Sequence, residues 1–494
     1  ARLVEAVERR GTTDPGAARQ PAEEFLSRAA DEVGLLVEHG GGQWGFLHAA
    51  FREFFAAAAL HAEDRFEQAV DEHLYEPSWE EVIRLGAAYY VLVQKRSAKA
   101  EQFVEHLLRA ASPAGWTWLG AVLRKQLGLA SLVAADLGEA LPLARRDAVA
   151  REFFDWTSSV PIEICERFWR QIAGSALACS VGPLYVAAIR DGDMRAAWRG
   201  AHAAVALGLR EAAEPLQEIV REALDIAGRS QRDLVARPPE RAIVAHTAVW
   251  ALAGLGAYRS FPLLRRAVEE ENPQFGRDAA HAIAQLWSPY HDLLVPEAVR
   301  QETARAFGQP GLVETADVLR RALAARNPGI RANAALALWE MGAAEAWDDL
   351  VPLARQDSDA EVRTAAAFAL RGFATTTDRP MPPDVRWPSA LGSTPVPATV
   401  PATTSGPEDD DVLLNRLRSD SVSKRVEAIR ELGRRRSLVA ALPLVRFFES
   451  ADEHLPGSLI FHLNGGTTRM VVPEDEVRRA LWSIAEAHPA ARWR

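Results

Sequence analysis

The sequence predicts an all-α protein, an α-solenoid of stacked helix pairs, and three observations predict it. Apolar residues recur at helical spacing along most of the 494 residues. A short helical motif is repeated together with the turn residues that precede it. Glycine punctuates the chain between helices, and the next helix opens near a Pro-Leu pair. Helices of this size bury their apolar sides only by stacking on neighbours, which is the principle of a solenoid.

The clearest repeat compares Ile330–Leu338 with Val362–Leu370, which begins 32 residues later. In both copies an Arg follows the first apolar residue, and alanines fill the next positions. The turns Asn327-Pro328-Gly329 and Asp357-Ser358-Asp359 precede them, and their residue types start helices. Small alanines let neighbouring helices approach closely, while Leu and Phe fill the space between layers. Further copies of this inner helix are predicted at Ile243–Leu255, Arg277–Leu286, Val422–Leu432 and Val477–Ala485.

Glycines are predicted to end the inner helices. Each of these glycines precedes a Pro-Leu pair, and they are Gly208, Gly256, Gly342 and Gly433. Glycine readily adopts the left-handed conformation that stops a helix. The prolines that follow are Pro215, Pro262, Pro352 and Pro443. A proline in the first turn of a helix costs little, because its missing N–H has no partner inside the helix.

The motif as a whole resembles the HEAT repeat, a helix pair of about 40 residues that stacks on its neighbours. The resemblance extends from about Ala242 to Phe373 and again from Val412 to His488. We therefore divide the chain by its patterns. The predicted regions are 1–62, a winged-helix remnant; 63–240, irregular helical pairs; 241–373, HEAT repeats; 374–411, a linker; and 412–494, C-terminal HEAT repeats.

Two segments interrupt the repeats. Residues 374–411 are rich in Thr and Pro and end in four acidic residues, Glu408 to Asp411, so we expect a flexible linker without a helix. We interpret the acidic run as a solvated charge run rather than a cation site. Residues 457–472 place two short apolar runs around Asn464-Gly465-Gly466, which predicts a β-hairpin insertion. The hairpin could contact a partner or cover the last layer of the array.

Residues 22–60 carry the most specific local pattern. The sequence predicts a helix at Ala22–Val33, strands at Leu35–His39 and Trp44–Leu47, and a helix from His48 to Leu60. The run Phe46 to Ala57 resembles the F-x-H-x-x-F-x-E-[FY]-x-A-A segment of NACHT-type signal-transduction NTPases. Gly34 to Glu38 is similar to a strand of the same winged-helix domain, and Trp79 to Ile83 to the W-x-E-V-I helix that follows. Arg52 stands where many members have Gln.

The resemblance implies a role for His48 and a fold for its neighbours. By position, His48 would contact a phosphate of bound ADP in the intact parent protein, and an imidazole N–H is a suitable donor to phosphate oxygen. Without the resemblance, a histidine that begins a helix is the simpler interpretation. Phe51, Phe54 and Phe55 are predicted to be core residues, and Glu53 an exposed or capping carboxylate. The chain itself has no G-x-x-x-x-G-K-[ST] loop, so ADP or ATP with Mg is expected only in the parent, on an NTPase module upstream.

Several other functions are excluded or disfavoured by the residues present. No G-x-S-x-G, H-E-x-x-H or Cys/His metal set occurs, so no catalytic residue and no metal ligand is predicted. The two cysteines, Cys165 and Cys179, are interpreted as buried free thiols. A net charge of -10 disfavours nucleic acid as a partner, and no apolar run is long enough for a membrane span. Tryptophans such as Trp116, Trp118, Trp198, Trp250, Trp339 and Trp482 are expected in the core or between repeats.

Together these patterns predict the C-terminal part of a NACHT-type NTPase. The resemblance implies a cytoplasmic sensor arm that masks the NTPase in its ADP state, binds a protein or other macromolecular ligand, and permits oligomerisation, often in bacterial antiviral defence. One alternative is a freestanding HEAT scaffold for protein assembly. Another is a HEAT-repeat lyase-like accessory enzyme, which would need a reactive group facing the groove, and Cys165 or Cys179 could serve as that group.

Overall fold

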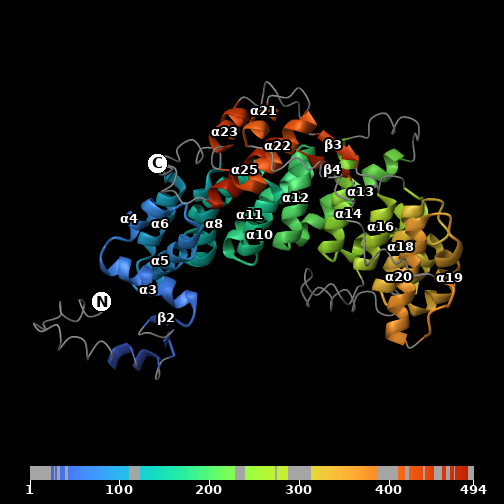
Figure 1. Ribbon diagram of the computed structural model, residues 1–494, viewed down its shortest axis with the longest axis horizontal. Coiled ribbons are helices and arrows are strands. Elements are labelled where there is room, and N and C mark those ends of the chain that lie inside the picture. Colours follow the sequence, from blue (N-terminus) through green and yellow to red (C-terminus); the bar gives the residue numbers. More distant parts are fainter. Residues whose placement is uncertain are drawn as a thin grey trace, which may run out of the picture. The chain divides into compact units, whose positions relative to one another are not determined.

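The computed structural model describes most of the chain, and its helices and strands are shown in Figure 1. The described residues are 24–26, 28–30, 34–38, 43–110, 123–227, 240–272, 275–286, 313–377, 379–385, 410–417, 422–437, 440–449, 459–462, 468–471 and 473–487. They divide into two compact units, one formed by 1–149 with 482–494 and the other by 150–481. The boundaries fall inside α9 (Leu143–Ser159) and α25 (Pro473–Ala487).

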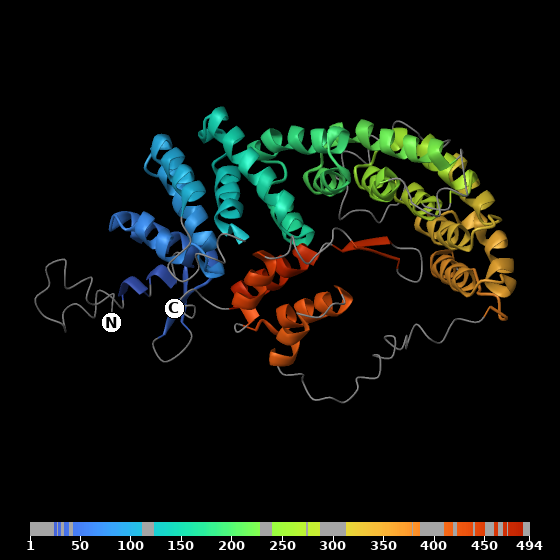
Figure 2. The same cartoon turned by 90° about the horizontal axis from the view of Figure 1, so that it is seen from above.

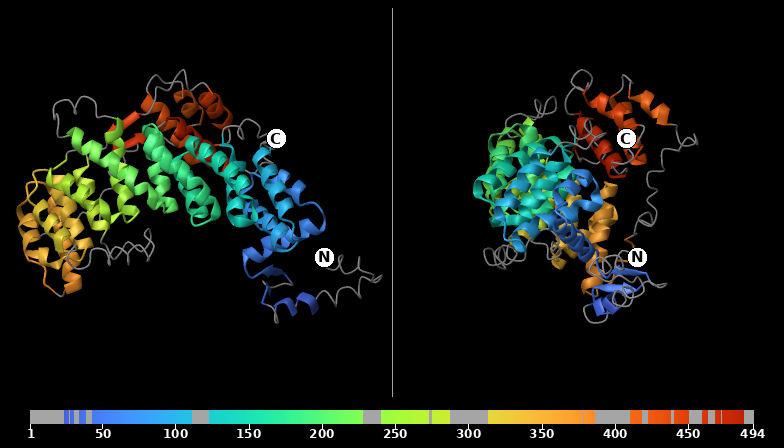
Figure 3. Two further views of the ribbon diagram at one scale, coloured as in Figure 1. Left: turned by 180° about the vertical axis from the view of Figure 1, so that it is seen from behind. Right: turned by 90° about the vertical axis from the view of Figure 1, so that its left-hand side faces the viewer.

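The first unit begins with a two-stranded sheet that leads into a set of helices. Strand β1 (Leu36–Glu38) pairs antiparallel with β2 (Trp44–Phe46), as the sequence predicts, and the pair lies at the start of α3 (Figure 3). The helices that follow are α3 (Ala49–Ala62), α4 (Phe66–His73), η1 (Pro77–Trp79), α5 (Glu80–Leu92), α6 (Ser97–Arg109), α8 (Lys125–Leu137) and η2 (Gly138–Ala140). Of the predicted helix at Ala22–Val33, residues 24–26 and 28–30 are described and are helical.

The core of the first unit forms where α5 crosses α3, α4 and α6. Phe66 and Phe103 are buried, and their ring centroids lie 5.2 Å apart. Gly86 lies directly under the Phe66 ring, because a Cβ there would be 2.0 Å from a ring carbon. His61 is stacked on Phe66, and its Nε2 lies 2.8 Å from the carbonyl oxygen of Gly86. Gly86 thus allows α5 to approach the ring of Phe66 closely.

The second unit contains an array of helix pairs. Its helices are α10 (Ile162–Ile172), α11 (Ala176–Asp191), α12 (Met194–Leu207), η3 (Arg210–Ala212), α13 (Ala213–Ala227), α14 (Glu240–Gly254), η4 (Tyr258–Ser260), α15 (Phe261–Glu269), α16 (Gly276–Gln285), α18 (Pro328–Glu340), η5 (Ala344–Ala346), α19 (Trp347–Gln356) and α20 (Ala360–Thr377). Residues 313–322 are also helical. The predicted inner helices in this part of the chain are all confirmed.

These helices form two rows, which can be followed from green to orange in Figure 2. The first row consists of α10, α12, α14, α16, α18 and α20, each in contact with the next. The second row contains α11, α13, α15 and α19, and each of these packs on the first-row helix that follows it in the chain. Alanines of α18 and α20 are buried where these neighbours meet, and they are Ala332, Ala334, Ala335, Ala337, Ala365, Ala366, Ala367 and Ala369. The predicted stacking of helix pairs is therefore confirmed.

Three of the four predicted glycine stops are confirmed. Gly208, Gly256 and Gly342 have φ of 71°, 61° and 72° respectively, the left-handed region that glycine adopts without strain. Gly433 was predicted wrongly, because it lies inside α22 (Val422–Arg435) and not at its end. A Cβ at Gly433 would be 2.7 Å from the Cα of Ala480. That glycine is required by a close helix contact and not by a turn.

The repeated arginine has a structural role that the sequence did not reveal. Arg331 Nη1 donates to the carbonyl oxygens of Ala325 (2.7 Å) and Arg326 (3.0 Å), in the turn that precedes α18. Arg363 Nη1 makes the same pair of bonds to Asp357 (2.6 Å) and Ser358 (3.1 Å). Each arginine thus ties the first turn of its own helix to the carbonyls of the turn before it. Helix starts are capped as predicted, since side chains of Asn327 and Asp359 accept from backbone N–H groups.

The linker prediction is wrong at both ends. Residues Ala374–Thr377 complete α20, where the threonine hydroxyls donate to carbonyls of the preceding turn. Residues 379–385 run along α19, and Val385 is buried there. Asp410 begins α21 (Asp410–Arg416) and accepts a hydrogen bond from Ser437. The remaining linker, 386–409, with Glu408 and Asp409, lies outside the described residues.

The C-terminal elements complete the second unit. They are α21, α22, α23 (Ala441–Glu449), β3 (Leu459–His462), β4 (Thr468–Val471) and α25. Strands β3 and β4 pair antiparallel, which confirms the predicted hairpin, although the turn at Asn464–Gly466 is outside the described residues. Arg479 donates to both carboxylate oxygens of Glu163 on α10, at 2.8 and 2.7 Å.

We predict that the Arg331–Asp357 pair stabilises the array more than an exposed pair on the same helix. Arg331 donates to both carboxylate oxygens of Asp357 at 2.9 and 2.8 Å, and only 6% of the Asp357 side chain is exposed. Asp357→Asn should lower the free energy of unfolding by about 2 kcal/mol at pH 7, measured by urea unfolding. The control Asp348→Asn breaks the pair with Arg379, in which the Asp348 side chain is 80% exposed. It should change the free energy of unfolding much less.

The difference in free energy of unfolding between the wild type and Asp357→Asn should also depend on pH. Hydrogen bonding to Arg331 holds the pKa of Asp357 below its usual value. A lowered pKa in the folded state means that this stabilisation is present above the unfolded-state pKa of about 3.9 and disappears as pH falls through the folded-state value. The wild type and the Asp357→Asn variant should therefore converge in strong acid. A constant difference from pH 7 to pH 2 would contradict the assignment.

Candidate functional site

The candidate binding surface is the side of the first row that no second-row helix covers. On α12, α14, α16, α18 and α20, incompletely buried residues recur three or four positions apart, as one face of a helix requires. These stripes include Trp198 with His202, Thr247 with Trp250, His281 with Gln285, Leu336 with Glu340, and Thr364 with Phe368. Because the helices lie side by side, the stripes form one surface, which we call the first-row face.

Aromatic rings gather at the α12–α14 part of this face. The His202 ring lies between two indoles, with its centroid 4.9 Å from that of Trp198 and 4.9 Å from that of Trp250. Trp250 is 37% exposed and meets His202 of the neighbouring helix, so of the two predicted positions it takes the one between repeats and not the core. The buried side of α14 is filled by smaller residues such as Val249 and Leu252, and the indole is left on the uncovered side. Trp482 is buried, as predicted, whereas Trp116 and Trp118 lie outside the described residues.

A second aromatic group lies at the α18–α20 part of the face. Trp339 and Phe368 meet edge to face, with ring centroids 5.0 Å apart, and Phe368 is also partly exposed. The indole lies against the backbone of Gly372, where an added Cβ would be 1.9 Å from Trp339 Nε1. This glycine sets the position of the tryptophan on the face.

Three histidines of the first row face carboxylates of neighbouring helices. Nδ1 of His202 lies 3.5 Å from Glu166, and Nδ1 of His246 lies 2.6 Å from Asp278. His281 lies farther from its carboxylate, with 3.9 Å between Nδ1 and Glu340.

The carboxylates of Glu166 and Glu340 differ in the direction of their pKa shifts. The nearby His202, with Nδ1 3.5 Å from the carboxylate, is the main cause that lowers the pKa of Glu166. Burial instead raises the pKa of Glu340, so its charge is poorly compensated by the described residues.

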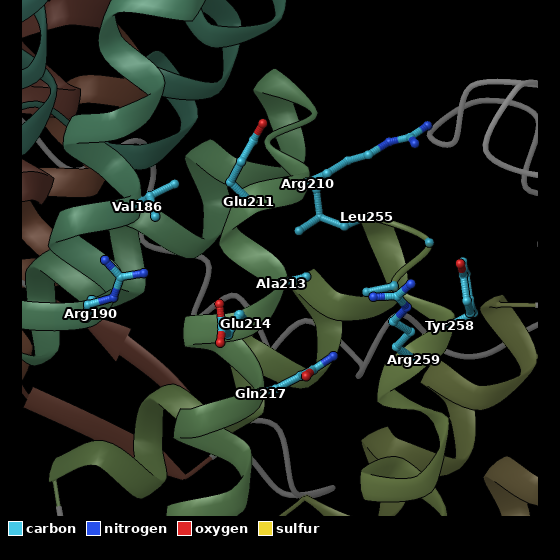
Figure 4. A pocket seen from close by; sticks show the side chains of 12 residues that line it. Val186, Arg190, Arg210, Glu211, Ala213, Glu214, Gln217, Leu255, Tyr258 and Arg259 are labelled. Carbon is cyan, nitrogen blue, oxygen red and sulfur yellow. The ribbon is translucent and has the colours of Figure 1, made fainter. Parts of the chain in front are cut away.

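An open cavity of about 820 Å³ lies beside the turns between the rows (Figure 4). Arg190 and Arg259 line it, together with Glu211, Glu214 and Gln217. In the figure the side chains of Arg190, Glu214 and Arg259 lie around the opening, whereas Glu211 points away from them. Because cations and carboxylates both line the cavity, its charge does not select one class of ligand.

His48 is the one site residue that the sequence predicts, and the structure places it at the start of α3. It is the N-cap residue, its side chain makes no capping hydrogen bond, and it is exposed. No other described residue completes a phosphate site around it in this chain, so the phosphate contact stays a prediction. Arg52 and Glu53 pair with each other on the same helix, 3.3 Å apart.

The phenylalanines of α3 are not core residues in this chain. Phe51 and Phe54 are each 37% exposed and Phe55 is 42% exposed, which contradicts their predicted burial. Phe46 stacks on Phe55 at 5.6 Å and is equally exposed, and Leu47 is more exposed still. Helical spacing places Phe51, Phe54 and Phe55 near one another on α3, and Tyr89 of α5 covers part of this side, with its ring centroid 6.3 Å from that of Phe54. We call this group, Phe46, Leu47, Phe51, Phe54 and Phe55, the α3 aromatic patch.

The two cysteines lie in different surroundings. Cys165 is buried as predicted, and its thiol donates to the carbonyl of Thr157 at 3.3 Å. Arg199, which is 4% exposed, donates to the same carbonyl at 2.7 Å and to that of Val160 at 2.6 Å. Cys179 is exposed, so its predicted burial is wrong. Among the described residues no group of His, Cys, Asp and Glu is arranged to hold a metal ion.

Comparison with known proteins supports the fold. A family model for HEAT repeats matches residues 292–371, which include α18. No curated protein matches the chain. Among solved structures the chain is similar to a chain of the "Structure of the Pds5-Scc1 complex and implications for cohesin function", with 11% identity and a TM-score of 0.27. The alignment covers 86% of this chain but only 64% of that one, so this chain spans less than two thirds of its length.

The predicted all-α solenoid of HEAT-like helix pairs is thus confirmed by the two rows of helices and by the HEAT match. None of the described helices is both long enough and apolar enough to cross a membrane.

We predict that Gly372 is required for the position of Trp339. Gly372→Ala should destabilise the array by about 1–3 kcal/mol, because the added methyl group displaces the indole. Urea unfolding of Gly372→Ala in the wild type and in a Trp339→Ala background forms a double-mutant cycle. The cost should largely disappear in the Trp339→Ala background. An equal cost in both backgrounds would show that the glycine acts elsewhere.

Proposed function

We propose that this chain is the ligand-sensing and autoinhibitory arm of a NACHT-type NTPase, and that it binds a protein on its first-row face. The observation that carries the proposal is the exposed set of aromatic side chains on a row of helices that is otherwise closely packed. Tryptophan supplies much of the contact energy in protein interfaces, and it is uncommon on surfaces that meet only water. Trp250 and Phe368 are the most exposed of these rings.

The α3 aromatic patch supports the proposed autoinhibitory contact with an NTPase module. Burying a fully exposed phenylalanine contributes about 1.5–3 kcal/mol. The phenylalanines of the patch are already more than half covered, so each contributes less than this, but together the five neighbouring apolar side chains form a contact surface. The patch lies directly beside His48, on the segment that resembles the NACHT winged-helix domain. An NTPase module packed there would cover the phenylalanines and bring its nucleotide to the histidine. When bound, ADP or ATP with Mg would supply the phosphate that His48 contacts.

The mechanism follows from these two surfaces. In the ADP state the α3 aromatic patch and His48 would hold the NTPase module closed. A protein ligand on the first-row face would shift the arm and release that contact, which permits nucleotide exchange and oligomerisation. The shift requires that the ligand bind the open state more tightly than the closed one. A role in bacterial antiviral defence belongs to the same proposal.

The first-row face is tested by site-specific photo-cross-linking. A photoreactive phenylalanine analogue at position 250 or 368 should form adducts with the partner in cells. The same analogue at the exposed position 218, on the second-row helix α13, should not. Mass spectrometry of the adducts identifies the partner. Equal labelling from all three positions, or adducts from position 218 alone, would refute a binding role for the first-row face.

The role of His48 is tested in the protein that carries the NTPase module. His48→Ala should speed the release of bound ADP about tenfold or more, because a charge-assisted hydrogen bond to phosphate contributes about 1.5–3 kcal/mol. Release of a fluorescent ADP analogue measures the rate, and Arg52→Ala on the same helix is the control. Unchanged release, or a reading frame in which no P-loop precedes this segment, would defeat the NTPase proposal.

A further inference from the structure

Two indoles of the first-row face, Trp198 of α12 and Trp250 of α14, lie on either side of one imidazole. We call these two tryptophans the indole pair. The centroid of the His202 ring is 4.9 Å from that of each indole. His202 meets Trp198 edge to face and Trp250 at an angle of 37°, so it does not lie flat on either indole. Trp250 is exposed and Trp198 is partly exposed. Part of each indole is therefore open to a ligand.

The indole pair also offers two hydrogen-bond donors. An indole N–H donates a hydrogen bond and cannot accept one. No described residue accepts a hydrogen bond from the N–H of Trp198 or Trp250. The buried Trp169, by contrast, donates from Nε1 to the hydroxyl of Tyr185 at 2.7 Å, as an indole enclosed in a core does. The N–H groups of the indole pair are left for an acceptor on a ligand, such as a peptide carbonyl.

The charged side chains beside these rings already have partners within the protein. The carboxylate of Glu166 lies 3.5 Å from His202 and 3.0 Å from Arg170. The guanidinium carbon of Arg199 is 6.0 Å from the centroid of the Trp198 ring, and its Nη1 donates to two backbone carbonyls at 2.7 and 2.6 Å. A ligand that complements the indole pair is therefore uncharged, with apolar rings and free carbonyls.

A polyproline II segment has this chemistry. It is a helix of three residues per turn without internal hydrogen bonds, so its carbonyls are free to accept. Proline-rich segments bind in grooves lined with aromatic side chains, and they lose little entropy because their extended conformation is already formed. An α-helix suits the two donors less well, because its carbonyls are used within the helix.

The spacing of the two indoles also fits such a segment. With a rise of about 3.1 Å per residue, prolines three positions apart lie about 9.3 Å apart on the same side of a polyproline II helix. Trp198 and Trp250 belong to neighbouring helices, and packed helices are about 8–10 Å apart. Their centroids are separated by at most twice the 4.9 Å that joins each of them to His202. Two prolines three positions apart therefore match the two indoles.

We infer that the indole pair binds an uncharged proline-rich segment in the polyproline II conformation. One proline lies against Trp198, a second proline three positions along lies against Trp250, and the indole N–H groups donate to carbonyls of the segment. The inference rests on the proposed protein-binding role of the first-row face, and it specifies the class of segment and the spacing of its prolines.

The experiment compares two short fluorescein-labelled peptides of the same composition, made of Pro, Ala, Ser and Gln. In the first peptide prolines recur at every third position, and in the second their separations alternate between two and four. Fluorescence anisotropy with the full chain should show about tenfold tighter binding of the first peptide. The difference is expected because only the first peptide places successive prolines on one side of the helix.

Variants of the indole pair locate the binding site. Trp250→Ala and Trp198→Ala should each weaken the first peptide about tenfold or more. Trp250→Phe keeps an aromatic ring and removes the N–H, so it should weaken binding about fivefold without disturbing the fold. Phe368→Ala removes an exposed ring from another part of the same face, and it is the control that should leave the affinity unchanged.

Three results would overturn the inference. They are equal affinity for the two peptides, unchanged affinity in both alanine variants of the indole pair, and single-stranded DNA that binds more tightly than the first peptide and loses this affinity in Trp250→Ala. The last result would indicate a base-stacking site. If the peptides fail to bind but position 250 cross-links to a protein in cells, only the proline-rich segment is rejected. If both fail, the role of the face itself is rejected.

Discussion

Close contact between neighbouring first-row helices is the constraint on which the structure depends. Helices α18 and α20 meet through alanines, so their backbones approach and the larger side chains are directed elsewhere. A second-row helix covers the other side of each pair. What remains is one narrow stripe per helix that no described second-row helix covers, and the stripes align because the helices do. The first-row face is thus a result of how the array is packed.

The periodic parts of this fold could be predicted from the sequence. Repeated alanines, helix-starting turns and glycine stops identify α14, α16, α18 and α20 without any coordinates. Gly433 shows the limit of such patterns, because a glycine followed by Pro-Leu serves equally as a turn or as a point of close helix contact. Only the position of Ala480, far along the chain, decides between the two. The same limit applies to Ala374–Thr377, whose threonines suggest a linker but continue a helix by bonding to the turn before.

The candidate site was harder to predict than the fold. Trp250 and Trp347 both occur at helical positions, yet Trp347 is buried and Trp250 is not. Which side of a helix is covered depends on the partner helix, and hydrophobic spacing does not identify that partner. The predicted burial of the α3 phenylalanines was wrong for the same reason, because their spacing indicates an apolar side but does not show whether another element covers it. A phosphate contact for His48 could be proposed only because the segment resembles a known family. Its exposed position at a helix start is compatible with a phosphate ligand and equally with a histidine that only begins a helix.

The segment 379–385 has a consequence for how the array ends. Arg379 lies over the ring of Trp347, with 4.9 Å from its guanidinium carbon to the ring centroid, while Asp384 pairs with Arg355 and Val385 is buried. A stack of repeats needs a water-compatible end, because an open last layer presents an apolar edge to other molecules. Here a short non-helical segment places charged side chains along α19, the last helix of the second row. Without it, Trp347 and the apolar surface around Val385 would be exposed to water.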